Sequence, residues 1–243
     1  MKKIKFLMMA AVALLTASTF VACGDDDDDS KGGQPSNMER YQQEVDATVK
    51  SQKKNDKAIL VVAFGSTWQQ AYDAFDLTVE EYKKEFPGYD VYLSFSSAIC
   101  INRAMAGEHV KPRNFYEPKY WLEAFGRVQY KEIIVQSMQV IPGEEYTRVI
   151  NAMKDFANNS NGDLDDKYLS TMTLKLGYPL MAEYPSDVNK LAKALNDNFS
   201  SYAQQGALLF MGHGNPDTYD TYKANVRYTQ LETALKAYNS NYY

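Results

Sequence analysis

The residue best placed to do chemistry is His213, which stands between two glycines directly after the apolar run 207–211. Glycine on both sides lets the backbone turn sharply and lets a flat ligand approach closely. A neutral imidazole binds divalent metals and accepts protons near neutral pH. This setting favours a functional role, although most single histidines are structural. The other histidine, His109, lies in a polar loop and is expected to be a solvated surface residue.

Two adjacent acids, Glu144 and Glu145, follow the apolar run 133–140 and open a predicted helix. For Glu144 the preferred interpretation is a favourable interaction with the helix dipole. One of the two could instead face a crevice and act as a proton acceptor or a metal ligand. Cys100 has no histidine near it in sequence and is expected to be a small buried apolar residue.

These residues need elements to position them, and the hydrophobic pattern predicts an alternation of strands and helices. Strands are expected at 58–64, 92–95, 133–140, 172–176 and 207–211, and helices at 39–54, 68–86, 97–106, 117–126, 142–156, 186–202 and 217–238. Such an alternation indicates an α/β fold with parallel sheets and right-handed crossovers. Sites in these sheets lie at the carboxyl ends of the strands. His213 and the two glutamates are therefore expected at the same edge.

Composition excludes several classes of function. The 243 residues are 45% hydrophobic with a net charge of −5, which argues against a nucleic-acid partner. Two cysteines and two histidines exclude a disulfide scaffold and a cysteine-rich zinc module. The chain has no P-loop, dinucleotide fingerprint, zincin helix or nucleophile elbow, so ATP use is not indicated.

The N-terminal residues have the pattern of a targeting signal. Residues 1–22 combine three lysines with an apolar run and are predicted to be a signal peptide. Residues 20–23 resemble a bacterial lipobox, which predicts that Cys23 is acylated; a plain signal peptide is the alternative. Residues 23–38 then form an acidic tether, which resembles a surface-export signal or is a solvated spacer. The expected location is the bacterial outer membrane, facing the periplasm or the cell exterior.

A weak internal similarity concerns the domain organisation. Residues 58–65 align with 207–214, each as an apolar run that ends at a glycine turn. It indicates a first α/β domain at 39–185 and the start of a second at 186–243. Since a single βα unit cannot bury a sheet, we expect either that the last segment joins the first sheet or that the sequence is a fragment.

Four segments together resemble a known family. They are VVAFGST at 61–67, VQSMQVIPGEEY at 135–146, LGYPL at 176–180 and FMGHG at 210–214. In this order they are similar to the anaerobic sirohydrochlorin cobaltochelatases, class II chelatases related to ferrochelatase. The resemblance implies two similar α/β domains, with the second incomplete here. It implies a lyase of cobalamin biosynthesis that inserts a divalent metal, typically Co²⁺, into sirohydrochlorin without ATP.

The same resemblance implies roles for residues and partners. By similarity, His213 binds the metal and accepts pyrrole protons, and Glu145 lines the same cleft. Co²⁺ would be a substrate rather than a permanently bound cofactor, and a tetrapyrrole would be the other substrate. The membrane is a partner through the predicted lipid anchor at Cys23, and a homo-oligomer stays open. Gln139 stands where relatives often carry histidine, and a further acid and a second active-site histidine would lie past residue 243.

Two alternatives stay open. One is a non-catalytic surface lipoprotein that captures a tetrapyrrole or a metal ion with the same cleft. The other is a carbohydrate-binding lipoprotein, which depends on the 19 tyrosines and the location. Because the tyrosines are scattered at helix ends and in loops, amphipathic packing explains them better.

Overall fold

The computed structural model describes residues 36–220 and 222–243. The predicted signal peptide 1–22, Cys23 and the tether up to residue 35 lie outside the described residues. The helices are α1 (Asn37–Gln52), α2 (Gln69–Glu85), α3 (Ala98–Ala106), α4 (Pro118–Arg127), α5 (Glu144–Ala157), α6 (Asp166–Thr171), α7 (Ser186–Ala203) and α8 (Val226–Lys236), with a 3₁₀ turn η1 (Asp217–Tyr219). The strands are β1 (Lys57–Ala63), β2 (Asp90–Phe95), β3 (Glu132–Ser137) and β4 (Thr173–Gly177).

The four strands form one parallel sheet in the order β2-β1-β3-β4. Ile59 of β1 lies beside Val91 on one side and Ile134 on the other. β1 is buried along nearly its whole length, as a central parallel strand covered on both faces should be. The predicted α/β class with a parallel sheet and flanking helices is therefore confirmed.

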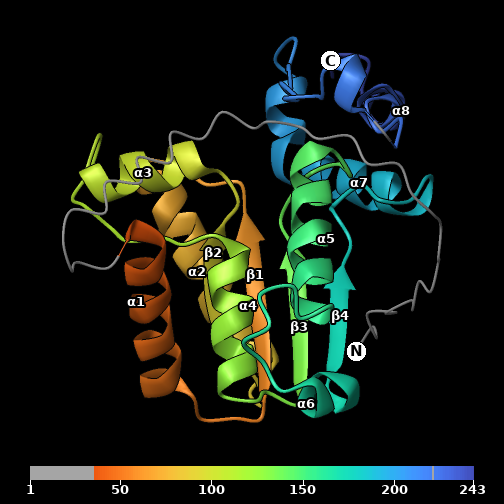
Figure 1. The fold of residues 1–243 in the computed structure, drawn as a ribbon. Coiled ribbons are helices and arrows are strands. Elements are labelled where there is room, and N and C mark those ends of the chain that lie inside the picture. Colours follow the sequence, from red (N-terminus) through yellow and green to blue (C-terminus); the bar gives the residue numbers. More distant parts are fainter. Residues whose placement is uncertain (1–35, 221) are drawn as a thin grey trace.

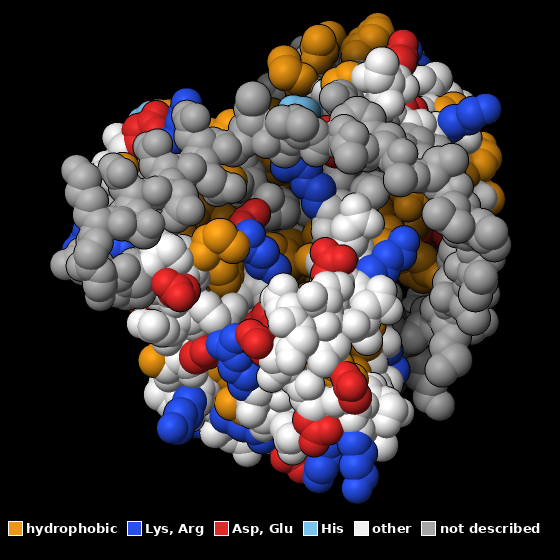
Figure 2. All heavy atoms as spheres, in the orientation of Figure 1, with side chains coloured by type: hydrophobic (Ala, Val, Ile, Leu, Met, Phe, Trp, Pro, Cys, Tyr) orange, Lys and Arg blue, Asp and Glu red, His pale blue; other side chains and the backbone are white. Residues whose placement is uncertain are grey.

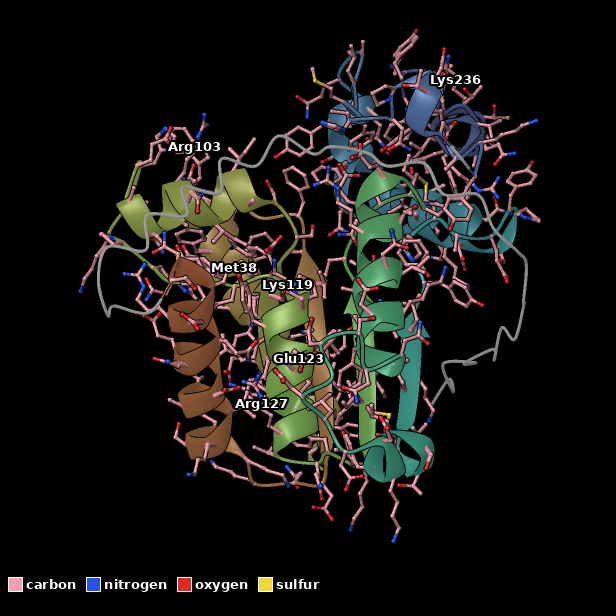
Figure 3. The ribbon with its side chains drawn as sticks, in the orientation of Figure 1. Met38, Arg103, Lys119, Glu123, Arg127 and Lys236 are labelled. Carbon is pink, nitrogen blue, oxygen red and sulfur yellow. The ribbon has the colours of Figure 1, made fainter. Side chains whose placement is uncertain are left out.

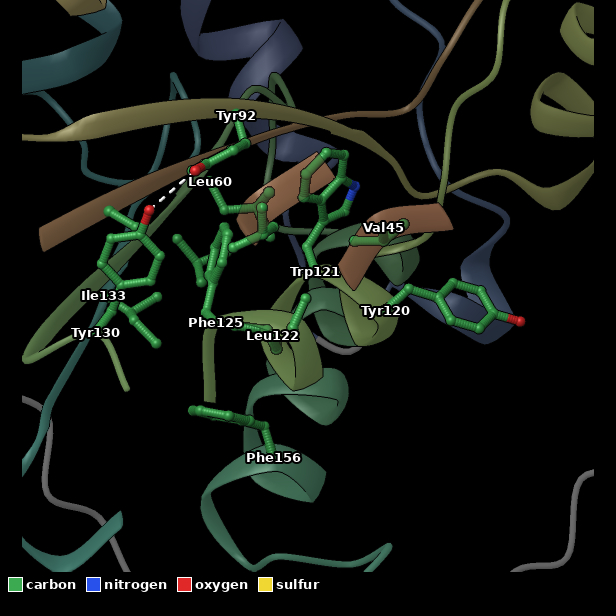
Figure 4. Packing of buried hydrophobic residues seen from close by; sticks show 14 of the residues in the cluster. Val45, Leu60, Tyr92, Tyr120, Trp121, Leu122, Phe125, Tyr130, Ile133 and Phe156 are labelled. Carbon is green, nitrogen blue, oxygen red and sulfur yellow. Dashed lines mark hydrogen bonds between the residues drawn. The ribbon is translucent and has the colours of Figure 1, made fainter. Parts of the chain in front are cut away.

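Alternate residues of β1 point to opposite faces of the sheet. Ala58, Leu60 and Val62 pack with α1, α4 and α5, where Tyr92, Trp121 and Phe125 add large aromatic rings (Figure 4). Ile59 and Val61 pack on the other face with Val79 of α2. Figure 1 shows α1, α4 and α5 in front of the sheet, and α3, α7 and α8 beyond its upper edge.

Several predicted elements differ from the structure. Residues 207–211 were expected to be a strand, but they form a single parallel bridge between Leu208 and Tyr242 and do not join the sheet. The predicted helix 217–238 is shortened to α8, and just before it the carboxylate of Asp220 accepts from the backbone N–H groups of Ala224 and Asn225. β3 ends at Ser137, three residues before the end of the predicted strand 133–140. Helix α6 was not predicted, although Asp165 caps it through the N–H groups of Lys167 and Tyr168.

The C-terminal segment has a hydrophobic cluster of its own. Its buried members are Ile141, Met181, Val188, Ala192, Ala203, Ala224, Leu231, Leu235 and Tyr242. Ile141 and Met181 come from the loops after β3 and β4, so this cluster sits against the carboxyl edge of the sheet. No helix among the described residues is long and apolar enough to cross a membrane.

Candidate functional site

Large apolar side chains are exposed where the chain leaves the strands. Phe64 follows β1, Val140 follows β3, and Tyr178 and Leu180 follow β4, while Met211 lies in the C-terminal segment and is fully exposed. Hydrophobic side chains also gather on the surface over the C-terminal segment (Figure 2). Since soluble proteins rarely group exposed apolar residues without a role, the carboxyl edge of the sheet is the candidate site.

His213 lies at this edge, on the exposed loop after residues 207–211. It lines a pocket of about 500 Å³ together with Val140, Phe210, Met211 and Tyr228, among others. Its Nδ1 lies 2.8 Å from the carbonyl oxygen of Gly214. A carbonyl oxygen only accepts, so this contact requires a proton on Nδ1, and the neutral form of the ring then has its lone pair on Nε2. The imidazole is thus accessible beside an opening, as its proposed role requires.

Each of the two glycines that flank His213 is explained by a different feature of the structure. A Cβ on Gly212 would stand 2.3 Å from the ring of Tyr228, which leaves no room for a side chain. Gly214 adopts φ +67°, a left-handed conformation that favours glycine. The loop that carries His213 is therefore shaped by the start of α8.

The first turn of α5 lies against this loop. A Cβ on Gly143 would stand 2.2 Å from the side-chain oxygen of Asn215, two residues after His213. Glu144 forms an ion pair with Arg148 at 2.5 Å, one turn further along α5, and its interaction with the helix dipole stays a prediction. Glu145 is half-buried, and within the described part of the chain its side chain has no hydrogen bond or ion pair. The structure brings the segments of His213 and Glu145 together, while the roles of the two residues stay predictions.

Tyrosine hydroxyls lie close to the same turn. Burial, helped by the nearby hydroxyls of Tyr178 and Tyr222, raises the pKa of Tyr146 to about 12. Tyr146 is therefore a neutral hydroxyl at physiological pH. Its hydroxyl group can donate a hydrogen bond but does not supply a negative charge for a metal ion.

Two amide nitrogens near the site have no partner. The side-chain Nε2 of Gln139 and Nδ2 of Asn215 are both buried and make no hydrogen bond in the structure. Unpartnered buried donors are uncommon, and a water or a bound ligand usually satisfies them. Among residues 36–220 and 222–243, no group of three histidine, cysteine or acidic side chains could hold a metal ion.

His109 and Cys100, which the sequence analysis left without a chemical role, both contact the segment that follows β1. His109 is exposed as expected, but its Nδ1 lies 2.7 Å from the hydroxyl of Thr67 and its ring stacks on Trp68. It therefore anchors a loop rather than standing free in solvent. Cys100 is half-buried, and a Cβ on Gly65 would stand 2.8 Å from its Cβ. This close packing agrees with an apolar role for the thiol.

Sequence reasoning did not find the residues that support His213. Asn225 and Tyr228 lie within the predicted helix 217–238, and Asn215 follows the glycine motif without a recognisable pattern. Asn225 bonds to Asn215 across ten residues through side chain and backbone. Its position near the start of a helix was the available signal, because asparagine is common where helices begin.

Comparisons with known proteins identify the family of this chain. A family described as cobalt chelatase (CbiK) matches residues 57–242. The sirohydrochlorin cobaltochelatase of Salmonella typhimurium is 25% identical over 159 residues, which cover 65% of this chain and 54% of that protein. Sirohydrochlorin cobaltochelatase CbiKC of Nitratidesulfovibrio vulgaris is 29% identical over 178 residues, which cover 70% and 57%. The chain spans about half the length of these curated relatives.

Proposed function

The chain belongs to the cobalt chelatase (CbiK) family, and from this premise we propose that it delivers Co²⁺ to sirohydrochlorin without ATP, as a lyase of tetrapyrrole and cobalamin biosynthesis. Metal and macrocycle are both substrates in this proposal, and no permanently bound cofactor takes part. The two sirohydrochlorin cobaltochelatases similar to this chain support the choice of substrate class.

One observation carries the proposal: an accessible imidazole lines an apolar pocket. His213 is exposed and lines the pocket, and Phe210, Met211 and Val140 supply apolar walls beside it. A flat macrocycle needs apolar surface for its faces and a metal donor near its centre. The glycines around His213 allow such a ligand to approach the backbone.

The chemistry requires two proton transfers. Metal insertion removes two N–H protons from the macrocycle and needs a ligand that releases the metal. A single imidazole with few protein ligands binds Co²⁺ weakly enough to give it up. In this proposal His213 binds the metal and accepts a proton, and the unpaired carboxylate of Glu145 accepts the other.

Metallation of the macrocycle tests the proposal. The full chain is incubated anaerobically with sirohydrochlorin and Co²⁺, and the absorbance change of metallation is followed. We expect turnover by the wild type and a loss of at least about 100-fold in His213→Ala, in line with the usual contribution of an acid–base group. His109→Ala is the matched control and should retain the wild-type rate. No metallation by the wild type, or an unchanged rate in His213→Ala, contradicts the catalytic proposal.

A second candidate is binding of a tetrapyrrole or a metal ion without turnover. The family resemblance implies a histidine in many relatives where Gln139 stands after β3, and the lack of this possible ligand favours binding without turnover. Under this alternative, sirohydrochlorin binds with an affinity that depends on His213, but no metallated product forms. The same assay, with fluorescence titration of the macrocycle added, separates the two candidates.

The location is proposed from residues outside the described part of the chain. We propose that Cys23 is lipidated after cleavage of residues 1–22 and that the protein is anchored to the outer membrane. Metabolic labelling with a radioactive fatty acid tests this directly. Wild-type protein should carry the label and Cys23→Ala should not; an unlabelled wild type argues for a plain signal peptide.

A further inference from the structure

We propose that Asn225 is a positioning residue, which sets the tautomer of His213 and thereby exposes its metal-binding nitrogen; this inference rests on the proposed function. The side chain of Asn225 binds both backbone groups of Asn215. Asn225 Oδ1 accepts from the Asn215 N–H at 2.8 Å, and Asn225 Nδ2 donates to the Asn215 carbonyl oxygen at 2.7 Å. A side-chain amide satisfies this pair in one orientation only, so its geometry is defined.

One peptide unit connects Asn225 with His213. The N–H group of Asn215 donates to Oδ1 of Asn225 and belongs to the same peptide unit as the Gly214 carbonyl oxygen. That carbonyl oxygen accepts from Nδ1 of His213 at 2.8 Å. A peptide unit is planar, and in the trans form its N–H and C=O point in opposite directions. Fixing the N–H on one side therefore fixes the carbonyl on the other. Asn225 thus aims the carbonyl that keeps the proton on Nδ1 and leaves Nε2 free.

Asn225 is itself held by Asp220. The carboxylate of Asp220 accepts from the N–H groups of Ala224 and Asn225, at 2.6 and 3.2 Å. Asn225 then leads into α8, whose Tyr228 closes the space beside Gly212. The amide therefore stands on a fixed helix start rather than on a free loop. Rigid support of this kind is what keeps a ligand side chain in one geometry.

Without the amide, the Gly214–Asn215 peptide loses its support. Gly214 at φ +67° has no side chain to hold it, so the peptide can rotate. His213 can then carry its proton on Nε2, which removes the lone pair needed for metal. We expect the affinity for Co²⁺ to fall about 10-fold in Asn225→Ala, as for other residues that support a metal-binding histidine.

Nitrogen-15 NMR of the histidine rings tests the inference in the full chain, because it reports the tautomer of His213 and His109 serves as internal reference. The wild type should show the Nδ1–H form, and Asn225→Ala should shift the neutral ring toward Nε2–H. Asn239→Ala is the matched control. The side chain of Asn239 also accepts from one backbone N–H, that of Asn241, and donates to one carbonyl oxygen, that of Ala203, but it is distant in sequence from the glycine loop. It should leave the tautomer and the Co²⁺ affinity unchanged.

Asn225→Asp separates the peptide contact from general damage to the loop. Aspartate still accepts from the Asn215 N–H but cannot donate to its carbonyl, so it should keep the Nδ1–H form. The same tautomer in Asn225→Ala and the wild type overturns the inference, and so does a loss of the Nδ1–H form in Asn225→Asp. Co²⁺ binding that is absent from the wild type, or insensitive to His213→Ala, contradicts the proposed function instead. In that case the tautomer measurement still decides the role of Asn225.

Discussion

At the level of single residues, the contact between Gly212 and Tyr228 makes a sharp prediction. Gly212→Ala would place a Cβ 2.3 Å from the ring of Tyr228, so either the ring or the loop must move. We expect a stability loss of about 1–3 kcal/mol, typical of overpacking, together with weaker Co²⁺ binding. Thermal unfolding and a Co²⁺ titration measure the two effects. Gly206→Ala is the control, because nothing lies within 4 Å of its added Cβ; equal effects of both variants would contradict the steric argument.

Glu123 gives a second prediction at the residue scale. It projects from α4 one turn before Arg127 (Figure 3), and it is 6% exposed. Its Oε1 accepts from Asn161 at 3.1 Å, while Oε2 is buried without a partner in the structure. Burial raises the pKa of this carboxyl, and the nearby Arg127 guanidinium offsets the effect only in part.

The sign of the pH effect follows from this raised pKa. Protonated Glu123 favours the folded state below the pKa of the unfolded chain, and this contribution is lost as the pH rises through the folded-state pKa. In Glu123→Gln the site is neutral at every pH. We therefore expect the free energy of unfolding of the wild type to fall relative to Glu123→Gln, by on the order of 1 kcal/mol, between pH 4 and pH 8. Urea unfolding at both values measures it; parallel pH profiles would contradict the prediction.

At the level of elements, Asp90 connects α1, β1 and β2 at the edge of the sheet opposite the candidate site. Its carboxylate accepts from the N–H groups of Lys54 and Asn55, from the Asn55 side chain and, at 2.6 Å, from the hydroxyl of Tyr130. Burial alone would raise the pKa of Asp90, but these hydrogen bonds outweigh it and lower the pKa. The carboxylate therefore joins the turn before β1 to the start of β2.

Replacing this carboxylate should loosen the connection. Asn in place of Asp90 presents an N–H group to at least one of these donors, so we expect a loss of about 2–3 kcal/mol near pH 7. Because the pKa of Asp90 is lowered, its contribution is present above the unfolded value near 3.9 and is lost as the pH falls through the folded pKa. The difference in the free energy of unfolding between the wild type and Asp90→Asn should thus disappear at acidic pH. Asp56→Asn, an exposed ion-paired control, should change little; a gap independent of pH would contradict the argument.

Elements with local signals were predictable from the sequence, and elements that need distant partners were not. The run at 58–64 became β1 because β2 and β3 cover both of its sides. Among the described residues, the backbone of the equally apolar run at 207–211 pairs with residues 241–243 on one side, so it forms a bridge and not a strand. His213 was identified from its glycines, whereas Asn225 acts through a contact ten residues away that no periodicity reports. The start of α1 had a clear signal, since Ser36 and Glu39 form a capping box.

At the level of the whole molecule, two of the four hydrophobic clusters among the described residues hold different ends of the fold. The larger one packs α1, α4 and α5 on the sheet, and the C-terminal one joins α7 and α8 to the loops after β3 and β4. The loop that carries His213 leaves the second cluster. Separate clusters of this kind often open independently, with the smaller one opening first. The candidate site would then depend on the stability of the C-terminal cluster more than on that of the sheet.

Tyr242 lets this division be tested. Its side chain is fully buried in the C-terminal cluster, its hydroxyl donates to Asn196 at 3.1 Å, and its backbone pairs with Leu208. Tyr242→Ala should destabilise this cluster by about 3 kcal/mol, since it removes a large buried ring. In native-state hydrogen exchange we expect faster exchange in α7 and α8 and unchanged protection in α1 and α4. Tyr243→Ala, which removes a half-exposed ring next to it, should leave both regions protected. If α4 exchanges as fast as α8 in Tyr242→Ala, the two clusters unfold as one unit, and the site then draws its stability from the entire fold.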